Sequence, residues 1–457
     1  MKYSKLIFLV PLLLEILMCR MNTAHKGCFV VLCFLFRLSL SAQTIYMLPV
    51  DELFEKGIQN SVAIRAAIVK TQISDERIAL AKNKLLPHLS VDGSFGYVGT
   101  PLIFNPDLSF LSRSKRPNWG QNYAISARQP LYEGGRIRNE IKRSELEKEI
   151  AELSLQNDKS DLKLWLVGKY LDLFNLYKKR DVYAQNIEEA KKRVHDIEKM
   201  KEQGIVTTND VLRSKLLLTN FDLAYKETTN DILLVSQQLD IVLGMDETIL
   251  IQPDTSFLKS FMKIQPENEY INQSYLQHPG LQIAQTNISL AQNALQLTKA
   301  DYLPSLSLGA GAGLIRPIPY IVPVEDLFIN TYGVTLNLSY NLSAFFDKKH
   351  SINAAKKQIQ LQGLFQEQQK QSIRTEIRAA FLKHQEAEDR IKALQESLTQ
   401  SKENYRIENN KYFNQLTILT DLLDAITTQL DVELQLTAAR TNSIYTYYQL
   451  LKASGNL

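Results

Sequence analysis

Stretches in which apolar and polar residues alternate strictly mark this chain. In YGVTLNLSYNL, residues 332–342, every apolar side chain falls on one face of an extended strand, and the Gly, Thr, Asn and Ser residues fall on the other. Similar alternation follows Pro87 and Pro304, and a less regular version spans 121–131. The pattern predicts strands of about 10 residues. Each strand either lays its apolar face on the core of a soluble sheet or turns that face toward lipid in a membrane barrel.

These strands belong to two copies of one larger unit. The segment ALAKNKLLPHLSVDGSFGY, residues 79–97, matches QLTKADYLPSLSLGAGAGL, residues 296–314, at an offset of 217 positions. In each copy a helical pattern stops at Leu-Pro, because proline lacks an amide hydrogen and disfavours helix at the residue before it. A strand pair follows. The predicted boundaries are 43–266 for the first repeat, 267–457 for the second repeat, and 88–131 and 305–342 for the strand pairs.

A very long helical stretch follows each strand pair. Residues 136–202 contain no proline and only Gly168, and residues 348–412 contain no proline and only Gly363. A helix of about 65 residues is roughly 100 Å long, which is too long for one compact core. Apolar residues in both stretches step by four and three positions, which predicts coiled-coil packing against other long helices. The stepping residues are Tyr183, Ile187, Ala190, Val194 and Ile197, and Ala387, Ile391, Leu394 and Leu398.

Each long helix is predicted to turn back at a short tip. The first tip is QGIVTTNDVL, residues 203–212, and the second is NQLTILTDLLDA, residues 414–425. An offset of 211 positions aligns the two tips and places Asp210 against Asp421. The tips therefore occupy equivalent places in the two repeats.

The residue that closes each tip differs between the repeats. Gly204 supplies the positive φ that a helix C-terminus favours, and Thr207, Thr208 or Asn209 can cap the next helix. Gln415 stands where Gly204 does in the alignment. We therefore expect the second tip to close with a different geometry.

The first 42 residues have the pattern of an export leader. A basic start and apolar runs end in small residues that suit cleavage next to Ala42. The apolar run is doubled, so Met21 is an alternative start, and a membrane anchor is a competing interpretation that the charged residues inside the run disfavour. All three cysteines lie in this leader and none has a good lipobox, so we expect no lipid anchor.

Charge and residue chemistry exclude several classes of function. Of 53 Lys and Arg and 49 Asp and Glu, the leader holds five bases and one acid, so 48 of each sign remain in the mature chain. A neutral chain gives no electrostatic case for nucleic acid, and a chain without cysteine has no thiol chemistry. The histidines lack the spacing of metal ligands, and hydrolase motifs are absent. The segment GAGAG at 309–313 does not lead into a helix, as a phosphate-binding loop would. We therefore expect no enzyme activity, no cofactor and no metal.

The strands are the candidate membrane element. After Gln43 no run of 18 apolar residues could form a transmembrane helix, which leaves a closed β-barrel as the way to cross a bilayer. Four strands are too few to enclose a lumen, for which about eight are the usual minimum. An isolated alternating strand is more common in soluble sheets, but the leader, the duplication and the very long helices together favour lipid. A barrel would then be shared among chains.

The order of these motifs resembles that of the TolC-like outer membrane efflux proteins. The shared features are a duplicated unit of helix, LLPxLS, strand pair, QPLYEGGR and long helix, with GIVTTNDVL and TDLLDA at the tips, over essentially the whole mature chain. The resemblance implies a mainly α fold with a small β part. Long antiparallel coiled-coil helices would form a periplasmic α-barrel, and each chain of a homotrimer would add four strands to one 12-stranded transmembrane β-barrel.

The resemblance also implies a function. Such a protein is the outer membrane channel, or exit duct, of a tripartite efflux or type I secretion system, and it is a passive conduit across the outer membrane and periplasm. Its helical tips dock onto a periplasmic adaptor, or membrane fusion protein, that joins it to an inner-membrane transporter. The alternative is a periplasmic coiled-coil adaptor or scaffold protein with a small soluble β-domain.

Roles at the tips follow from the same resemblance. In the family an aromatic residue and an aspartate form a hydrogen bond at the closed tip, and Tyr412 and Asp210 match this pair. A nearby arginine helps to lock the family's closed tip, but Thr417 occupies that position here. The residues expected to dock onto the adaptor are Gly204, Ile205, Gln415 and Leu416.

Two further acids are candidates for a pore constriction. Asp421 and Asp424 are three positions apart and share one helix face. In a trimer with that face inward they would form two stacked carboxylate rings that attract cations, which the resemblance favours. The alternative is that both acids complement the helix dipole in the first turn, for about 0.3 to 1 kcal/mol each.

Overall fold

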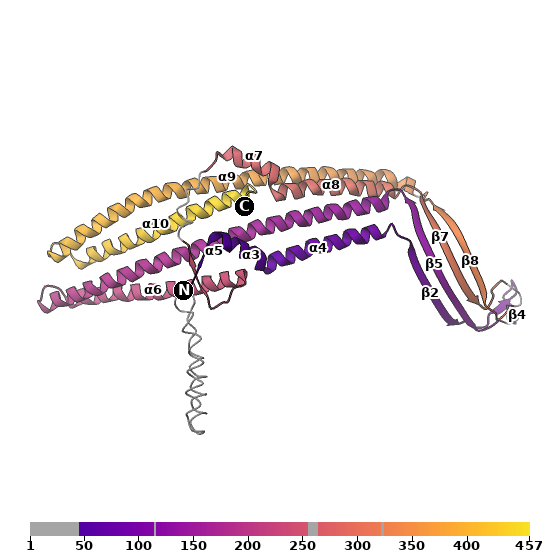
Figure 1. The fold of residues 1–457 in the computed structure, drawn as a ribbon, viewed down its shortest axis with the longest axis horizontal. Helices are drawn as coiled ribbons and strands as arrows, with labels where there is room; N and C mark the ends of the chain where they lie inside the picture. The colour runs from indigo at the N-terminus through magenta and orange to yellow at the C-terminus, as the bar shows by residue number, and fades with distance from the viewer. Residues whose placement is uncertain (1–44, 114–115, 255–263, 321–323, 343) are drawn as a thin grey trace, which may run out of the picture.

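The molecule is elongated, with long helices over most of its length and a small β-sheet at one end (Figure 1). It is a computed structural model in which residues 45–113, 116–254, 264–320, 324–342 and 344–457 are described. The predicted export leader lies outside these ranges. The two helical tips lie at the opposite end from the sheet (Figure 1).

Two helices run nearly the whole helical length and organise the others. They are α5, with 67 residues, and α9, with 70 residues, so the predicted long helices are confirmed. Toward the tips each pairs with a returning helix, α6 or α10, and toward the sheet each pairs with a shorter helix, α4 or α8. No helix in the described ranges has the length and apolar character needed to cross a membrane. The bounds are α4 Val62–Asn83, α5 Arg136–Glu202, α6 Thr208–Leu243, α8 Pro279–Ala300, α9 Ala344–Phe413 and α10 Leu419–Ala453.

Helix ends and buried faces follow the sequence pattern. The helices α4 and α8 stop before Pro87 and Pro304, as the Leu-Pro stops predict. The predicted seam on α5 is confirmed, because Ile187, Ala190 and Ile197 are buried in the core of the tip half. That core is completed by Val211, Phe221, Tyr412, Leu419, Leu422, Ile426 and Leu430.

The sheet has four antiparallel strands in the order β2-β5-β7-β8. All four predicted strands are present, but β8 begins and ends earlier than expected, so Tyr340 and Leu342 belong to the connection to α9. The connection between β2 and β5 contains an additional hairpin, β3-β4, that the sequence pattern did not predict. The bounds are β2 His88–Tyr97, β3 Leu102–Phe104, β4 Phe110–Arg113, β5 Trp119–Glu133, β7 Ser305–Arg316 and β8 Ile329–Ser339.

The register of the sheet separates an apolar face from a polar one. Across the four strands Val91 pairs with Ile125, which pairs with Ala312, which pairs with Tyr332. On the other face Ser90 pairs with Ser126, and Ser307 pairs with Asn337. The apolar face is open in a single chain, since the exposed fraction of Val91 is 81% and that of Tyr332 is 85%. Among the described residues, no core of the chain covers the apolar face.

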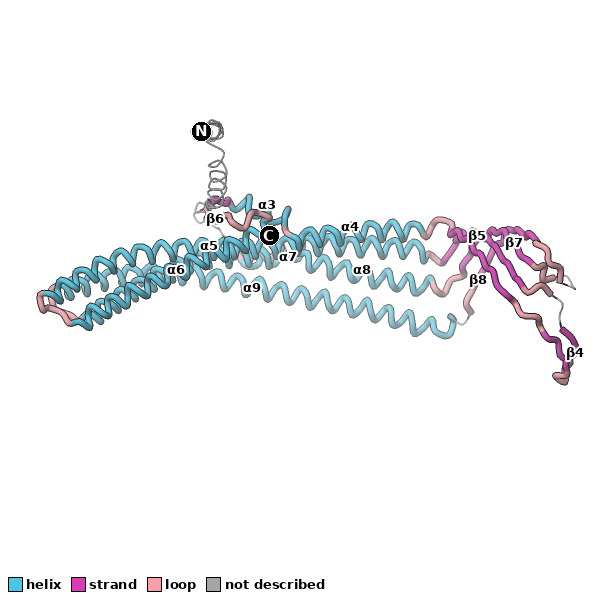
Figure 2. The backbone as a smooth tube through the Cα atoms, turned by 90° about the horizontal axis from the view of Figure 1, so that it is seen from below, coloured by secondary structure: helices cyan, strands magenta, loops and turns pink. Residues whose placement is uncertain are grey.

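A small layer of strands and helices covers the middle of the bundle (Figure 2). Here β1 pairs in parallel with β6, and α3 follows β1. The hydroxyl of Tyr170 on α5 donates to the Leu48 carbonyl at 2.7 Å, and that of Tyr177 donates to the Ile251 carbonyl at 3.0 Å. We call β1, α3 and β6 the equatorial layer. Its bounds are β1 Ile45–Leu48, α3 Val50–Asn60 and β6 Leu250–Pro253, and α7, Glu267–Gln277, lies against α9.

Candidate functional site: the helical tips

The first tip closes with a left-handed glycine and a capping box. Gly204 has a φ of 76°, and the amide of Ile205 donates to the Met200 carbonyl at 2.9 Å. The Thr207 backbone amide and hydroxyl both donate to the Asp210 carboxylate, at 2.8 and 2.7 Å, and the Asp210 amide donates back to the Thr207 hydroxyl. Thr207 is therefore the N-cap, and Asp210 stabilises the start of α6.

The second tip ends its long helix with the same backbone geometry, so the expectation of a different geometry at Gln415 is wrong. Gln415 has a φ of 62°. Its amide donates to the Tyr412 carbonyl at 2.9 Å, and the amide of Leu416 donates to the Lys411 carbonyl at 2.8 Å. These bonds match those around Gly204 in the first tip. A side chain in the left-handed region costs roughly 1 kcal/mol, and the two backbone bonds that end α9 offset this cost.

The Tyr412–Asp210 hydrogen bond that the resemblance implies is not formed within the chain. The side chain of Tyr412 is buried, and its hydroxyl has no hydrogen-bond partner among the described residues. Burial and the nearby negative charge of Asp210 raise the pKa of Tyr412. The two side chains are therefore neighbours, but the Asp210 carboxylate, which Tyr412 was expected to bind, accepts hydrogen bonds from Thr207 instead.

Asp421 and Asp424 lie on the exposed face of the first turns of α10. Asp421 accepts a hydrogen bond from the Thr417 hydroxyl at 2.7 Å. Thr417, which stands at the position of the family's arginine, thus donates a hydrogen bond to one of the candidate gate acids. No side chain caps α10 at Ile418, so a negative charge in this turn also complements the helix dipole.

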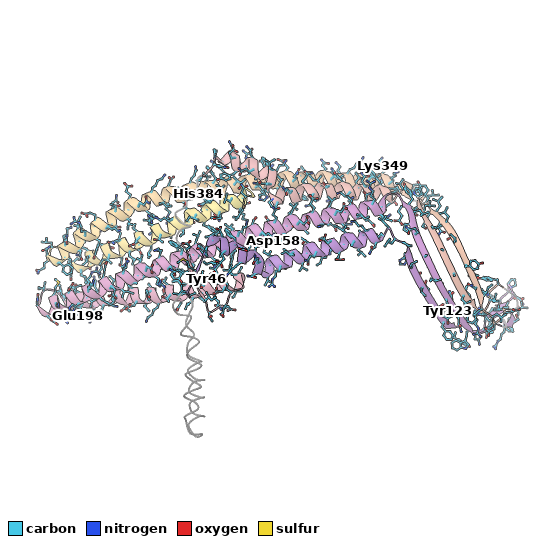
Figure 3. The ribbon with its side chains drawn as sticks, viewed as in Figure 1. Tyr46, Tyr123, Asp158, Glu198, Lys349 and His384 are labelled. Carbon is cyan, nitrogen blue, oxygen red and sulfur yellow. The ribbon has the colours of Figure 1, made fainter. Side chains whose placement is uncertain are left out.

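Polar contacts that the sequence pattern did not predict tie the two tips together. The guanidinium of Arg213 on α6 donates to the Thr420 hydroxyl on α10 at 2.6 Å. Further from the tips, the buried Arg193 on α5 donates to the Tyr405 hydroxyl on α9 at 3.2 Å. Within the first hairpin Lys215 pairs with Glu198, which Figure 3 places near the tip end, at 2.7 Å. The sequence carries no local signal for the contacts between the hairpins, because they join residues more than 200 positions apart.

The residues expected to dock onto a partner are all exposed at the end of the molecule. The exposed fraction is 76% for Leu416 and 42% for Ile205, and Gly204 and Gln415 are also exposed. Two apolar side chains therefore stand on the two turns where a partner could reach them. Elsewhere in the described ranges, no cluster of three His, Cys, Asp or Glu residues has the arrangement of a metal site.

Comparison with known proteins identifies the fold and the family. The sequence profile of the outer membrane efflux protein family matches residues 53–245 and 270–456. A crystal structure of CusC aligns with a TM-score of 0.74 at 15% identity, and covers 89% of this chain and 92% of that one. The outer-membrane channel OprN aligns with a TM-score of 0.72 at 18% identity, with coverages of 89% and 90%. The Campylobacter jejuni CmeC outer membrane channel aligns at 0.69 and 15% identity, with coverages of 89% and 85%.

These matches decide between the two functions left open by the sequence. Comparison with curated protein sequences finds no match. The structural matches establish the shared fold, and the profile covers most of the chain, including both helical hairpins. Members of the matched family are outer membrane channels rather than enzymes, with helices that extend into the periplasm, and the adaptor or scaffold alternative is not supported. This chain belongs to the outer membrane efflux protein family.

Proposed function

We propose that three copies of this chain form the exit duct of a tripartite efflux or type I secretion system. The observation that carries the proposal is the open sheet, in which β2 and β8 each have a neighbouring strand on one side only among the described residues. Free strand edges and an exposed apolar face are both unfavourable in water. Closure with the sheets of other copies pairs the edges and forms a barrel whose apolar face can lie in lipid. Three sheets of four strands make one 12-stranded barrel with the apolar face in lipid and the Ser, Thr and Asn face toward water.

Aromatic residues support the placement of the sheet in a bilayer. At the end of β2 and the start of β5, the rings of Phe95 and Trp119 stack with centroids 4.9 Å apart, and Tyr97 contacts Trp119 edge-on at 5.4 Å. Transmembrane barrels carry girdles of such side chains at the membrane interface. This cluster fits the outer interface, with the β3-β4 hairpin beyond it (Figure 1).

The lateral edges of the helical layer support assembly through helix packing. The helices α4 and α6 both flank α5 and expose apolar stripes, and α9 exposes apolar side chains at the opposite edge. On α6 the exposed residues recur at intervals that keep them on one helix face. In a trimer the α4–α6 edge of one copy packs on the α9 edge of the next. The exposed residues are Val62, Val69, Ile73 and Leu80 on α4, Leu212, Leu216, Leu223, Leu234 and Ile241 on α6, and Leu361, Leu364, Phe365 and Leu382 on α9.

The tips then serve as the entrance and the docking surface. Asp421 and Asp424 of three copies bring six carboxylates to the narrow end of the tube, where low-dielectric walls strengthen their attraction for cations. Asp210 and Tyr412 lie beside this constriction and are candidates for changing their hydrogen-bond partners when the constriction opens. Ile205 and Leu416, with Gly204 and Gln415, present apolar contacts to a periplasmic adaptor that joins the duct to an inner-membrane transporter.

Measuring the mass of the intact detergent-solubilised particle tests this proposal. Native mass spectrometry is expected to find three chains per particle, and dissociation of the trimer is expected to expose the sheet edges and cause loss of β-structure. A monomer that keeps its full β-structure contradicts the shared barrel.

A further inference from the structure

Asp240 is a carboxylate buried without a partner near the end of α6. Its exposed fraction is 0%, and neither carboxylate oxygen accepts a hydrogen bond from any residue in the described ranges. Burying an ionised carboxylate without a partner costs several kcal/mol, and nearly all buried polar groups in proteins are hydrogen-bonded. The position of Asp240 therefore needs a physical explanation.

The surroundings of Asp240 hold the equatorial layer on the bundle. Its helix neighbours Leu239 and Leu243 are fully buried in an apolar cluster with residues of β1, α3 and β6. One turn earlier, the Ser236 hydroxyl accepts a hydrogen bond from the amide of Ile251 on β6 at 2.7 Å. One turn later, the amide of Met245 donates to the backbone carbonyl of Asp240 at 2.9 Å, where the chain turns back over the helix. Asp240 thus lies beside the turn, 244–249, that leads into β6.

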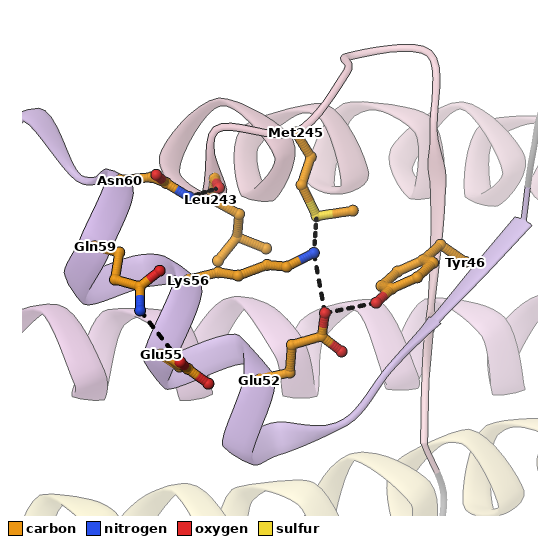
Figure 4. Close-up of polar contacts among 8 residues, drawn as sticks. All are labelled: Tyr46, Glu52, Glu55, Lys56, Gln59, Asn60, Leu243 and Met245. Carbon is orange, nitrogen blue, oxygen red and sulfur yellow. Dashed lines mark hydrogen bonds and ion pairs between the residues drawn. The ribbon is translucent and has the colours of Figure 1, made fainter.

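Among the described residues, no cation compensates the charge of Asp240. Lys56 on α3 pairs with Glu52 at 3.0 Å and directs its ammonium toward the Met245 sulfur at 3.9 Å (Figure 4). The charged groups on the turn itself, Asp246 and Glu247, have the same sign as Asp240. Asp246 accepts from Thr248, and Glu247 accepts from Gln237. The tyrosines that face this cluster from β1 and α5 bond elsewhere: Tyr46 with Glu52, Tyr170 with Leu48 and Tyr177 with Ile251.

Burial is the main reason that the pKa of Asp240 is raised, with smaller contributions from Asp246 and Glu247. The pKa rises from 3.8 to about 7. The carboxyl group is therefore largely neutral in mildly acidic conditions and ionised in mildly alkaline ones. The uncharged acid is far less costly to hold in an apolar cluster than the carboxylate.

We propose that Asp240 is a proton-dependent latch for the equatorial layer. When it is neutral, the apolar cluster closes around it and the 244–249 turn holds β6, and through β6 also β1 and α3, against α6. When it is ionised, the carboxylate draws water under the turn, and the layer separates from α6 more often. The inference concerns the middle of the bundle and does not depend on the proposed trimer or duct.

The direction of the pH dependence follows from the two states of the turn. In the open turn Asp240 has an ordinary pKa near 3.8 and is ionised above it, whereas in the closed turn it keeps its proton up to about pH 7. The closed turn thus loses stability as the pH rises from about 4 to about 7, and the loss levels off above that. Each pH unit inside this window shifts the opening equilibrium by up to about tenfold.

Hydrogen exchange of the purified full-length protein, measured by mass spectrometry at pH 5.5 and pH 7.5, tests the latch. After correction for intrinsic exchange rates, protection of peptides covering 45–60 and 244–254 is expected to fall by about tenfold or more at the higher pH. In Asp240→Asn, which removes the charge and keeps the size, the change is expected to shrink to about twofold or less. Asp231→Asn, an exposed acid on the same helix, is expected to behave as wild type.

Two results would overturn the latch. One is equal protection of the wild-type equatorial layer at both pH values, a measurement that needs no variant and stands even if Asp240→Asn fails to assemble. The other is an Asp240→Asn protein that keeps the wild-type pH dependence, which would assign the effect to another group.

Discussion

Arg213 and Thr420 join the two helical tips directly, because the guanidinium of one donates to the hydroxyl of the other at 2.6 Å. The contact links the start of α6 to the start of α10, and so connects the two repeats at the end where a channel entrance would open. Opening by separation of the hairpins requires that this bond break. The Thr417 hydroxyl, by contrast, stays within the second tip, where it donates to Asp421.

Removing the Arg213 guanidinium should favour an open entrance. Arg213→Gln and Thr420→Val each delete the cross-tip bond, so we expect the open population in planar bilayers to rise by roughly twofold or more. Because both variants remove the same bond, the double variant should add little to either single one. Lys201→Gln, a charge change in the last turn of α5 outside this contact, is the control and should conduct as wild type. Additive effects of the two substitutions would contradict a direct bond.

Neutralising the candidate gate acids should change ion selectivity while assembly is retained. Asp421→Asn with Asp424→Asn keeps the side-chain size and removes the charge, so the pore should lose its cation preference and its block by multivalent cations. Asp389→Asn on the exposed face of α9 is the matched control. Reversal potentials in asymmetric salt measure the effect. Unchanged selectivity in the double variant would show that these acids only complement the helix dipole in the first turn of α10.

Substitutions on the two faces of β8 should have opposite consequences. Leu338→Arg places a charge on the apolar face and should cost about 2 to 4 kcal/mol near the bilayer midplane, with less stable trimers on heating. Asn337→Arg, the adjacent residue on the polar face, should assemble normally and alter conductance. If Asn337→Arg blocked assembly and Leu338→Arg did not, the inner and outer faces of the barrel would be reversed.

Acid should destabilise the packing of α9 on α10 through His384. Its Nδ1 lies 3.0 Å from both the Ser443 carbonyl and the Thr446 hydroxyl. Burial lowers the pKa of His384 from its usual value, and the Ser443 carbonyl and Glu388 oppose this only in part. Figure 3 places His384 within the helical part of the bundle, far from the sheet. As the pH falls, His384 is therefore protonated in the unfolded chain before it is protonated in the folded chain. The stability contributed by neutral His384 is lost as the pH falls through 6.5.

The readout for His384 is the difference between wild type and a variant that cannot titrate. The melting temperature of His384→Gln relative to wild type should rise as the pH is lowered from 7.5 to 5.5. The comparison with the variant is needed because Asp240 acts in the opposite direction over this range. A constant difference between the two proteins would mean that His384 does not titrate in this range.

Much of the fold could be predicted because its patterns are local and repeated. Alternation identified the four sheet strands, the Leu-Pro stops ended α4 and α8, and the absence of proline marked the full lengths of α5 and α9. The β3-β4 hairpin was missed because LIF and FLSR are too short and too uniform to show alternation. The requirement that apolar residues share one face excludes register shifts of one residue, but the pairing of β5 with β7 across the two repeats was not predicted.

The features missed at the tips depend on energies that a sequence pattern does not carry. Gln415 adopts the conformation expected only of glycine because backbone hydrogen bonds at the end of α9 offset its cost. The Arg213–Thr420 contact joins residues 207 positions apart, so neither position indicates it alone. Asp240 looks like an ordinary helix acid in QLDIVLG, and only the packing of β6 and α3 makes it a buried one.

Electron cryo-microscopy of the purified protein in lipid nanodiscs tests the shared-barrel channel most directly. The expected map contains three copies whose β2 and β8 edges pair between neighbours, with Leu336 and Leu338 facing lipid and Asn337 facing a continuous water-filled lumen. A particle in which the four strands of one copy close on themselves, or bury Leu338 against protein outside the bilayer, would contradict the channel.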